Sequence, residues 1–148
     1  MKPAVVIGLG SPLMGDDGVG SHVAETLAAD SRLPAGVEVI AGGTDLLRHA
    51  GRMEGQSRVI LIDAVRGDGA PGTVAVWDDD LVGLDDRQEH AHHLSLVQAV
   101  KLLRMIVPAR FTLVGISVSA AGFGAGLSPA VAARVPAIVD RVLLELAR

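Results

Sequence analysis

Carboxylate and imidazole side chains gather in three short segments of this 148-residue sequence. Two aspartates follow a glycine-rich stretch near the start, one aspartate ends a long apolar run, and a group of histidines comes later. These residues are Asp16, Asp17, Asp63, His90, His92 and His93. Two carboxylates and one histidine make a ligand set suited to Zn, Ni, Mn or Fe. Three protein ligands would leave such a site open to water or substrate.

Most of these residues also have an ordinary structural interpretation. Asp16 and Asp17 precede a predicted helix, where carboxylates cap exposed N–H groups and favour the helix dipole. For either residue alone, capping is the preferred interpretation. Asp63 follows four apolar residues, where a carboxylate must be solvated, paired or functional, and we favour function. The histidine group could be a solvated loop, and His22 and His49 are expected to face solvent.

The elements that must position these residues alternate along the chain. Apolar runs predict strands over Ala4–Ile7, Val37–Ile40, Arg58–Val65, Thr73–Trp77 and Phe111–Ser119. Helical spacing predicts helices over Gly18–Ala29, Asp45–Met53 and His92–Val107, and a last one opened by Ser128-Pro129 and kinked at Pro136. The link between the third and fourth strands is too short for a parallel crossover, so the fourth strand should be antiparallel and at an edge.

This order of elements predicts an α/β fold. We expect a three-layer sandwich with a five-stranded, mostly parallel sheet, one antiparallel edge strand and helices on both faces. Ligands of such folds bind beyond the carboxyl ends of the strands. The acidic and histidine segments are therefore expected to meet at that edge of the sheet.

Composition limits the possible functions. The chain is 49% apolar with a net charge of −4, and we expect one domain over residues 1–148. It has no cysteine, which excludes disulfides, thiolate metal sites and cysteine nucleophiles. Mild acidity and 2% aromatic residues argue against nucleic acid as a partner. No apolar run is long enough for a membrane helix, so we expect a cytoplasmic protein. We also expect a monomer, because the sequence has no long apolar seam beyond the stripes that form the core.

Several common motifs are missing. Gly8 and Gly10 suggest a dinucleotide loop, but Leu13 stands at the third glycine position and no acidic residue ends the second strand. The chain also lacks a phosphate-binding P-loop, an HExxH zinc motif and a GxSxG nucleophile turn.

A series of short motifs, in order along nearly the whole chain, points to a known family. They are Gly8–Gly20, Gly42-Gly43-Thr44, Ile62-Asp63-Ala64, Pro71-Gly72-Thr73, His92–Leu96, Leu113–Ile116 and Gly126–Pro129. Their order and spacing resemble the hydrogenase maturation proteases, the nickel-dependent endopeptidases that process the large subunit of [NiFe] hydrogenases. No single motif is specific, but the set is.

The resemblance implies an aspartic-type endopeptidase that removes a C-terminal extension from a large-subunit precursor after nickel insertion. The nickel would come with the substrate, and zinc or cadmium could substitute. By position, the metal-contacting residues are Asp17, Asp63 and His92, the last because it stands just before the pattern x-Leu-x-Leu. Asp17 or Asp63 would act as general base. The resemblance also implies a substrate-recognition loop of Gly42, Gly43 and Thr44.

Two departures and two alternatives remain. The family usually has asparagine where Ser11 stands, and an acid where Ala41 stands, which affects the expected choice of substrate. A phosphoacceptor receiver-like signalling domain would use Asp16, Asp17 and Asp63, although the fifth strand ends without the lysine of such sites. A nucleotide-binding module would use the glycine-rich segment Gly8–Gly20, the glycine loop.

Overall fold

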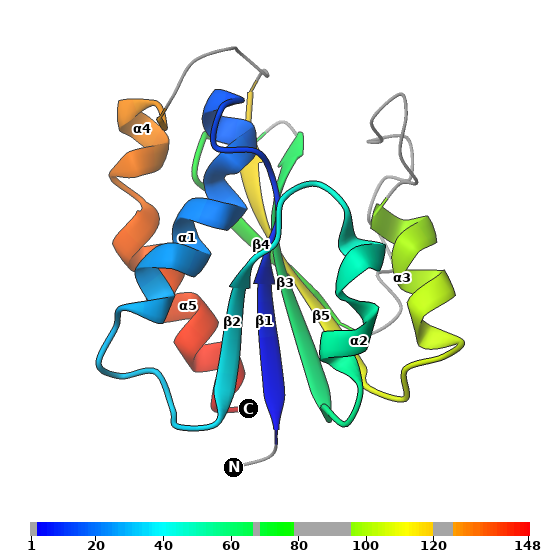
Figure 1. The fold of residues 1–148 in the computed structure, drawn as a ribbon. Coiled ribbons are helices and arrows are strands. Elements are labelled where there is room, and N and C mark those ends of the chain that lie inside the picture. Colours follow the sequence, from blue (N-terminus) through cyan, green and yellow to red (C-terminus); the bar gives the residue numbers. More distant parts are fainter. Residues whose placement is uncertain (1–2, 67–68, 79–95, 120–125) are drawn as a thin grey trace.

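The structure is a computed structural model that describes residues 3–66, 69–78, 96–119 and 126–148. A five-stranded sheet lies between two layers of helices (Figure 1). The strands are β1 (Ala4–Gly8), β2 (Val37–Ala41), β3 (Arg58–Arg66), β4 (Val74–Asp78) and β5 (Arg110–Val118). The α-helices are α1 (Val19–Ala28), α2 (Ala50–Met53), α3 (Leu96–Arg104), α4 (Pro129–Ala132) and α5 (Val135–Leu146). Two 3-10 helices, η1 (Gly15–Gly18) and η2 (Leu46–His49), precede α1 and α2.

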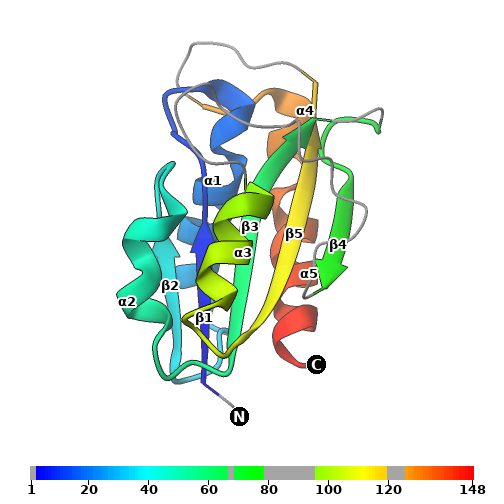
Figure 2. The same ribbon diagram turned by 90° about the vertical axis from the view of Figure 1, so that its right-hand side faces the viewer.

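The sheet has the order β2-β1-β3-β5-β4. Strand β1 pairs in parallel with β2 and β3, and β3 pairs in parallel with β5. Strand β4 pairs with β5 in the antiparallel direction and lies at the edge of the sheet (Figure 2). The predicted α/β class, the mostly parallel sheet and its antiparallel edge strand are confirmed.

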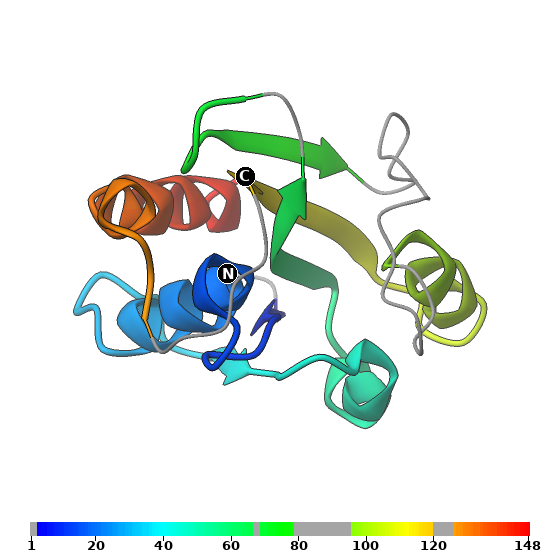
Figure 3. The same ribbon diagram turned by 90° about the horizontal axis from the view of Figure 1, so that it is seen from above.

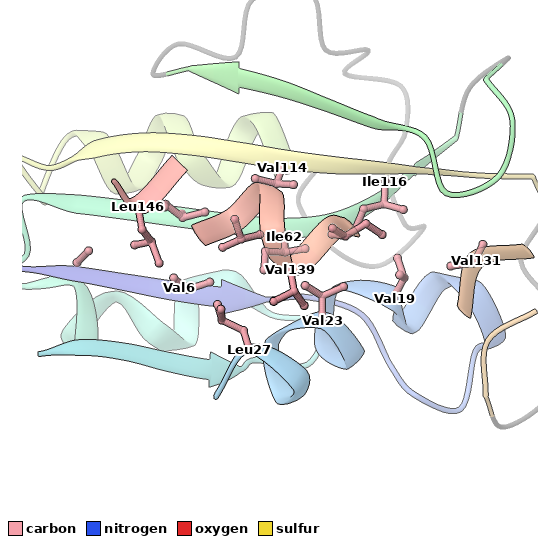
Figure 4. Packing of buried hydrophobic residues seen from close by; sticks show 14 of the residues in the cluster. Val6, Val19, Val23, Leu27, Ile62, Val114, Ile116, Val131, Val139 and Leu146 are labelled. Atoms are coloured by element: carbon pink, nitrogen blue, oxygen red, sulfur yellow. The ribbon is translucent and has the colours of Figure 1, made fainter. Parts of the chain in front are cut away.

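Two apolar clusters hold the layers together, one on each face of the sheet. Figure 3 shows the layers from above, with α1 and α5 on one face of the sheet and α2 and α3 on the other. Successive side chains of a strand point to opposite faces. In β1, Val6 therefore packs with α1 and α5, whereas its neighbours Val5 and Ile7 pack with α2 and α3. Figure 4 shows the first cluster, in which Ile62 of β3 meets the apolar faces of α1 and α5. Burial on both faces explains why the central strands are continuous apolar runs.

The predicted last helix is two helices. Ser128 caps α4, since its Oγ accepts a bond from the Val131 N–H at 3.4 Å. The helix is then interrupted between Ala132 and Val135, just before Pro136, which lies in the first turn of α5. Proline has no N–H to donate and its ring clashes with the preceding turn, so the expected kink is a break.

Other element ends differ by a few residues from those predicted. The first predicted helix, Gly18–Ala29, corresponds to α1 and is one residue shorter at each end, whereas Asp45–Met53 divides into η2 and α2. The described part of the helix predicted over His92–Val107 begins at Leu96 and ends at Arg104. In the parts of the chain that the structure describes, no helix is long and apolar enough to cross a membrane.

Candidate functional site

Asp63 lies where β3 extends past its neighbour β1. The last residue of β1 pairs with Ile62, and β3 continues alongside β5 as far as Arg66. Asp63 is therefore the first β3 residue beyond β1, at the carboxyl edge of the parallel strands. By alternation, its side chain belongs to the face that carries Leu61, which is the face covered by α2 and α3. The structure thus places Asp63 at the ligand-binding edge of the fold.

The environment of Asp63 disfavours a negative charge. Burial is the main reason why the pKa of this carboxyl group rises to about 7, and the nearby negative charge of Asp17 makes a smaller contribution in the same direction. A hydrogen bond that Oδ1 accepts from the Ala64 N–H, at 2.8 Å, acts in the opposite direction. A carboxyl group with a pKa near neutrality can both take and return a proton at physiological pH.

The glycine loop brings Asp17 to this edge through close backbone packing. A Cβ atom on Gly20 would overlap the carbonyl oxygen of Ile62, and one on Gly8 would overlap that of Gly20. A Cβ atom on Gly10 would overlap the carbonyl oxygen of Asp17. The start of α1 can therefore lie directly on the end of β3. These glycines make room for neighbouring backbone, which speaks against a phosphate-binding role for the loop.

Asp16 and Asp17 bond to different partners. Asp16 accepts two hydrogen bonds from Ser128, one from its N–H and one from its Oγ, each at 2.7 Å. Asp17 pairs instead with Arg66, whose Nη2 lies 3.1 Å from Oδ2. The interpretation of either aspartate alone as a helix cap is wrong, because the N-cap residues of η1 and α1 are Met14 and Gly18. Asp16 joins the loop to the last helices, whereas Asp17 faces the end of β3.

The segment with Gly42 and Gly43 lies against the glycine loop. The Gly42 N–H donates to the Gly8 carbonyl at 2.7 Å, and the Gly10 N–H donates to the Gly43 carbonyl at 2.8 Å. His49 of η2 adds a third bond, with its Nε2 at 2.9 Å from the carbonyl oxygen of Gly42. Since a carbonyl can only accept, Nε2 is the donor. The expectation that His49 faces solvent is therefore wrong, because its ring is partly buried and holds the segment with Gly42 and Gly43 in place.

The two departures from the family pattern flank the same region. The Oγ of Ser11 accepts a bond from the Leu13 N–H at 3.3 Å, so serine supports the glycine loop locally. Ala41 is exposed at the end of β2, directly before the predicted recognition loop. Thr44 of that loop is also exposed. An uncharged residue therefore precedes a loop that can contact a partner.

The histidines of the predicted site, His90, His92 and His93, lie outside the described residues. The structure does show that α3 is followed by a short connection to the start of β5, so α3 runs opposite to the parallel strands (Figure 2). Its first described residue, Leu96, therefore lies toward the carboxyl edge. Within residues 3–66, 69–78, 96–119 and 126–148, no three His, Cys, Asp or Glu side chains form a group that could hold a metal. The choice of His92 stays a prediction.

Two residues near the site have roles that the sequence did not indicate. Arg66 ends a mostly apolar strand, and a charged residue at that position is a usable but weak signal. His49 lies seven residues after Gly42, and its role depends on how η2 folds back below the loop. No spacing rule predicts such a contact.

Three kinds of comparison relate the chain to known proteins. A family model described as hydrogenase maturation protease matches residues 21–145. The chain is 31% identical to the hydrogenase 2 maturation protease of Escherichia coli K12, over 96% of this chain and 89% of that protein. It is 33% identical to the hydrogenase expression/formation protein HupD of Rhodobacter capsulatus, over 96% of this chain and 70% of that protein.

The fold is also similar to that of solved structures. The hydrogenase maturating endopeptidase HybD from E. coli superimposes with a TM-score of 0.82 at 29% identity, covering 98% of this chain and 92% of that one. A [NiFe] hydrogenase maturation protease HycI from Thermococcus kodakarensis gives a TM-score of 0.81 at 20% identity, covering 99% and 94%. The second likeness concerns the fold alone.

Proposed function

Because this chain belongs to the hydrogenase maturation protease family, we propose that it removes a C-terminal extension from the large-subunit precursor of a [NiFe] hydrogenase after nickel insertion. The observation that supports this most is the pair Asp17 and Asp63 at the carboxyl edge of the sheet. One carboxyl group is held near neutral pKa and the other is charge-paired to an arginine. This pairing of unlike carboxyl groups suits proton transfer next to a cation.

The side chains fit a borderline divalent cation such as nickel. Asp17 and Asp63 supply carboxylate oxygens, and His92 would supply an imidazole nitrogen, a donor set that nickel, zinc and cadmium accept. The carboxyl group of Asp63 resists ionisation because it is covered by the fold and lies near the carboxylate of Asp17. A nearby cation would therefore strongly stabilise its charged form. When bound, the cation would act as a Lewis acid that polarises the scissile carbonyl. We infer that the precursor brings this nickel with it.

Asp63 is the residue that we assign as general base. Its Oδ1 accepts the Ala64 N–H, and its Oδ2 is the atom that would take a proton from the attacking water. The same atom would return the proton to the leaving amine as the peptide bond breaks. In the metal-free protein, the pKa of about 7 lets this carboxyl group exchange a proton at physiological pH.

The loop Gly42-Gly43-Thr44 would contact the precursor next to the scissile bond. It is bonded to the glycine loop that carries Asp17, so a segment bound there lies close to the two aspartates. Three hydrogen bonds hold its two glycines, and this restricts the loop before the substrate arrives. Because the uncharged Ala41 stands before the loop, we expect a precursor whose contact with this position does not depend on an acidic side chain of this protein.

The proposal is tested by incubating the protein with a nickel-loaded large-subunit precursor and following the C-terminal cut by mass spectrometry. Asp63→Asn and Asp17→Asn should each slow the cut by at least about a hundredfold, as expected for loss of general base catalysis or of a charged ligand. Asp140→Asn is a matched control, since Asp140 pairs with Arg32 on the exposed side of α5. A wild-type rate for Asp63→Asn would overturn the assignment.

The same proteins separate this function from the receiver-like alternative. A small phosphodonor should leave Asp63 unlabelled, whereas a receiver domain would carry an acyl phosphate there. The antiparallel β4 at the edge of the sheet and the family membership favour the protease.

A further inference from the structure

An arginine forms an ion pair with one of the two carboxylates of the proposed site. Nη2 of Arg66 lies 3.1 Å from Oδ2 and 3.4 Å from Oδ1 of Asp17. The Asp17 side chain is only 14% exposed, while that of Arg66 is 44% exposed. The guanidinium group thus approaches from the solvent side and touches both oxygens of a mostly covered carboxylate.

The contact joins two elements that position the site independently of it. Asp17 is held in η1 by a bond from its N–H to the Met14 carbonyl at 3.2 Å, and by the close packing of Gly10. Arg66 is the last residue of β3, three residues after Asp63. The ion pair therefore links the segment that carries Asp17 to the end of β3.

A guanidinium group and a divalent cation compete for the same carboxylate oxygens. We propose that Arg66 is a built-in counter-ion of Asp17, which keeps the isolated protein from holding free divalent cations until a nickel-loaded precursor displaces it. The inference rests on the proposed function, in which Asp17 contacts the substrate's nickel. It makes Arg66 a positioning residue that acts through Asp17.

The exposure of Arg66 favours the exchange. Its guanidinium group is well solvated when it leaves Asp17, and the cation would take over the neutralisation of the mostly covered carboxylate. Its long side chain can turn into solvent while the backbone stays in β3. A positive charge next to the site would, in contrast, repel a free cation that lacks other ligands. A cation that arrives already bound to the precursor has the docked surface to offset that repulsion.

The test is a nickel titration of the purified full-length protein in competition with a chromophoric chelator. Arg66→Gln removes the charge and leaves a shorter polar side chain that still has an amide N–H donor. It should bind nickel about tenfold more tightly than the wild type, as expected from a unit charge a few ångströms from a divalent ion in a water-like medium. Arg66→Lys, which keeps the charge, should stay near the wild type.

Arg52→Gln is the matched control. Arg52 of α2 makes a similarly close pair with Glu38 of β2, with Nη2 2.9 Å from Oε2. It should leave nickel affinity unchanged. The double variant Asp17→Asn/Arg66→Gln should lose the gain of Arg66→Gln. The inference is overturned if Arg66→Gln binds nickel no better than the wild type, if Arg52→Gln gains as much, or if none of the proteins binds nickel.

The outcome is separable from that of the proposed function. If Asp17→Asn and Asp63→Asn abolish precursor processing while Arg66→Gln leaves nickel affinity unchanged, only the counter-ion role fails. If both aspartate variants process normally, the proposed function fails whatever the titration shows. Circular dichroism melting curves of each variant verify that the fold is intact.

Discussion

The carboxyl group of Asp63 is expected to destabilise the folded protein at neutral and alkaline pH. Its pKa rises from 3.8 to about 7 in the fold, mainly because burial disfavours the charged form. Between these values the folded state binds more protons than the unfolded state, so stability falls as pH rises through this range. Above about pH 7 the whole cost is present, and below about pH 4 it is absent. Asp63→Asn, which cannot ionise, should remove it.

The size of this effect follows from the pKa shift. Each pKa unit corresponds to about 1.4 kcal/mol, so the shift sets an upper limit of about 4 kcal/mol. The side chain is not fully buried, and solvent screening reduces the figure, so we expect a gain of about 2 kcal/mol for Asp63→Asn at pH 8. The amide oxygen can keep the bond from the Ala64 N–H. For a chain of this size the melting temperature should rise by about 5 °C.

The assay is urea unfolding of the metal-free wild type and Asp63→Asn from pH 4.5 to 8.5. The difference in the free energy of unfolding should grow with pH and level off above about pH 8. Asp140→Asn, at an exposed ion pair, should shift stability by less than about 0.5 kcal/mol and gain nothing. A pH-independent difference, or a loss of stability in Asp63→Asn at pH 8, would show that ionisation of Asp63 does not destabilise the fold.

Three further variants probe how the site is assembled. Gly20→Ala should cost about 2–3 kcal/mol in urea unfolding, because its Cβ would overlap backbone carbonyl oxygens, whereas Gly51→Ala, with open space around it, should not destabilise the protein. His49→Ala should raise the KM for the precursor about fivefold and change kcat by less than twofold, since it loosens the recognition loop; an effect mainly on kcat would contradict that role. Asp16→Ala should cost about 1–3 kcal/mol by leaving the Ser128 N–H and hydroxyl without their acceptor, and unchanged stability would show that this link is dispensable.

Much of the fold follows from local sequence signals. Apolar runs such as Arg58–Val65 predict buried strands, since a strand covered on both faces needs apolar residues throughout. The short link before β4 correctly predicts an antiparallel edge strand, because a parallel crossover does not fit in it. Strand ends shift by a residue or two, and the last helix breaks rather than bends at Pro136.

The site is predicted less completely. The sequence places Asp17 and Asp63 at one edge of the sheet, and the structure agrees. It cannot tell Asp16 from Asp17 by local pattern, because both lie in the first turn of η1 with identical side chains. Their roles separate only through partners elsewhere in the chain. His92 stays a prediction from the family resemblance.

Local sequence signals establish which residues are able to do chemistry and which elements carry them, because apolar periodicity, glycine positions and prolines act over a few neighbouring residues. Which of these groups meet depends on how the layers of the fold pack. Asp16 bonds to Ser128, 112 positions away, and Asp17 pairs with Arg66, 49 positions away. Burial of Asp63 likewise depends on how β3 is covered. Hydrogen bonds, ion pairs and desolvation depend on distances in space, and those are set only when the layers pack.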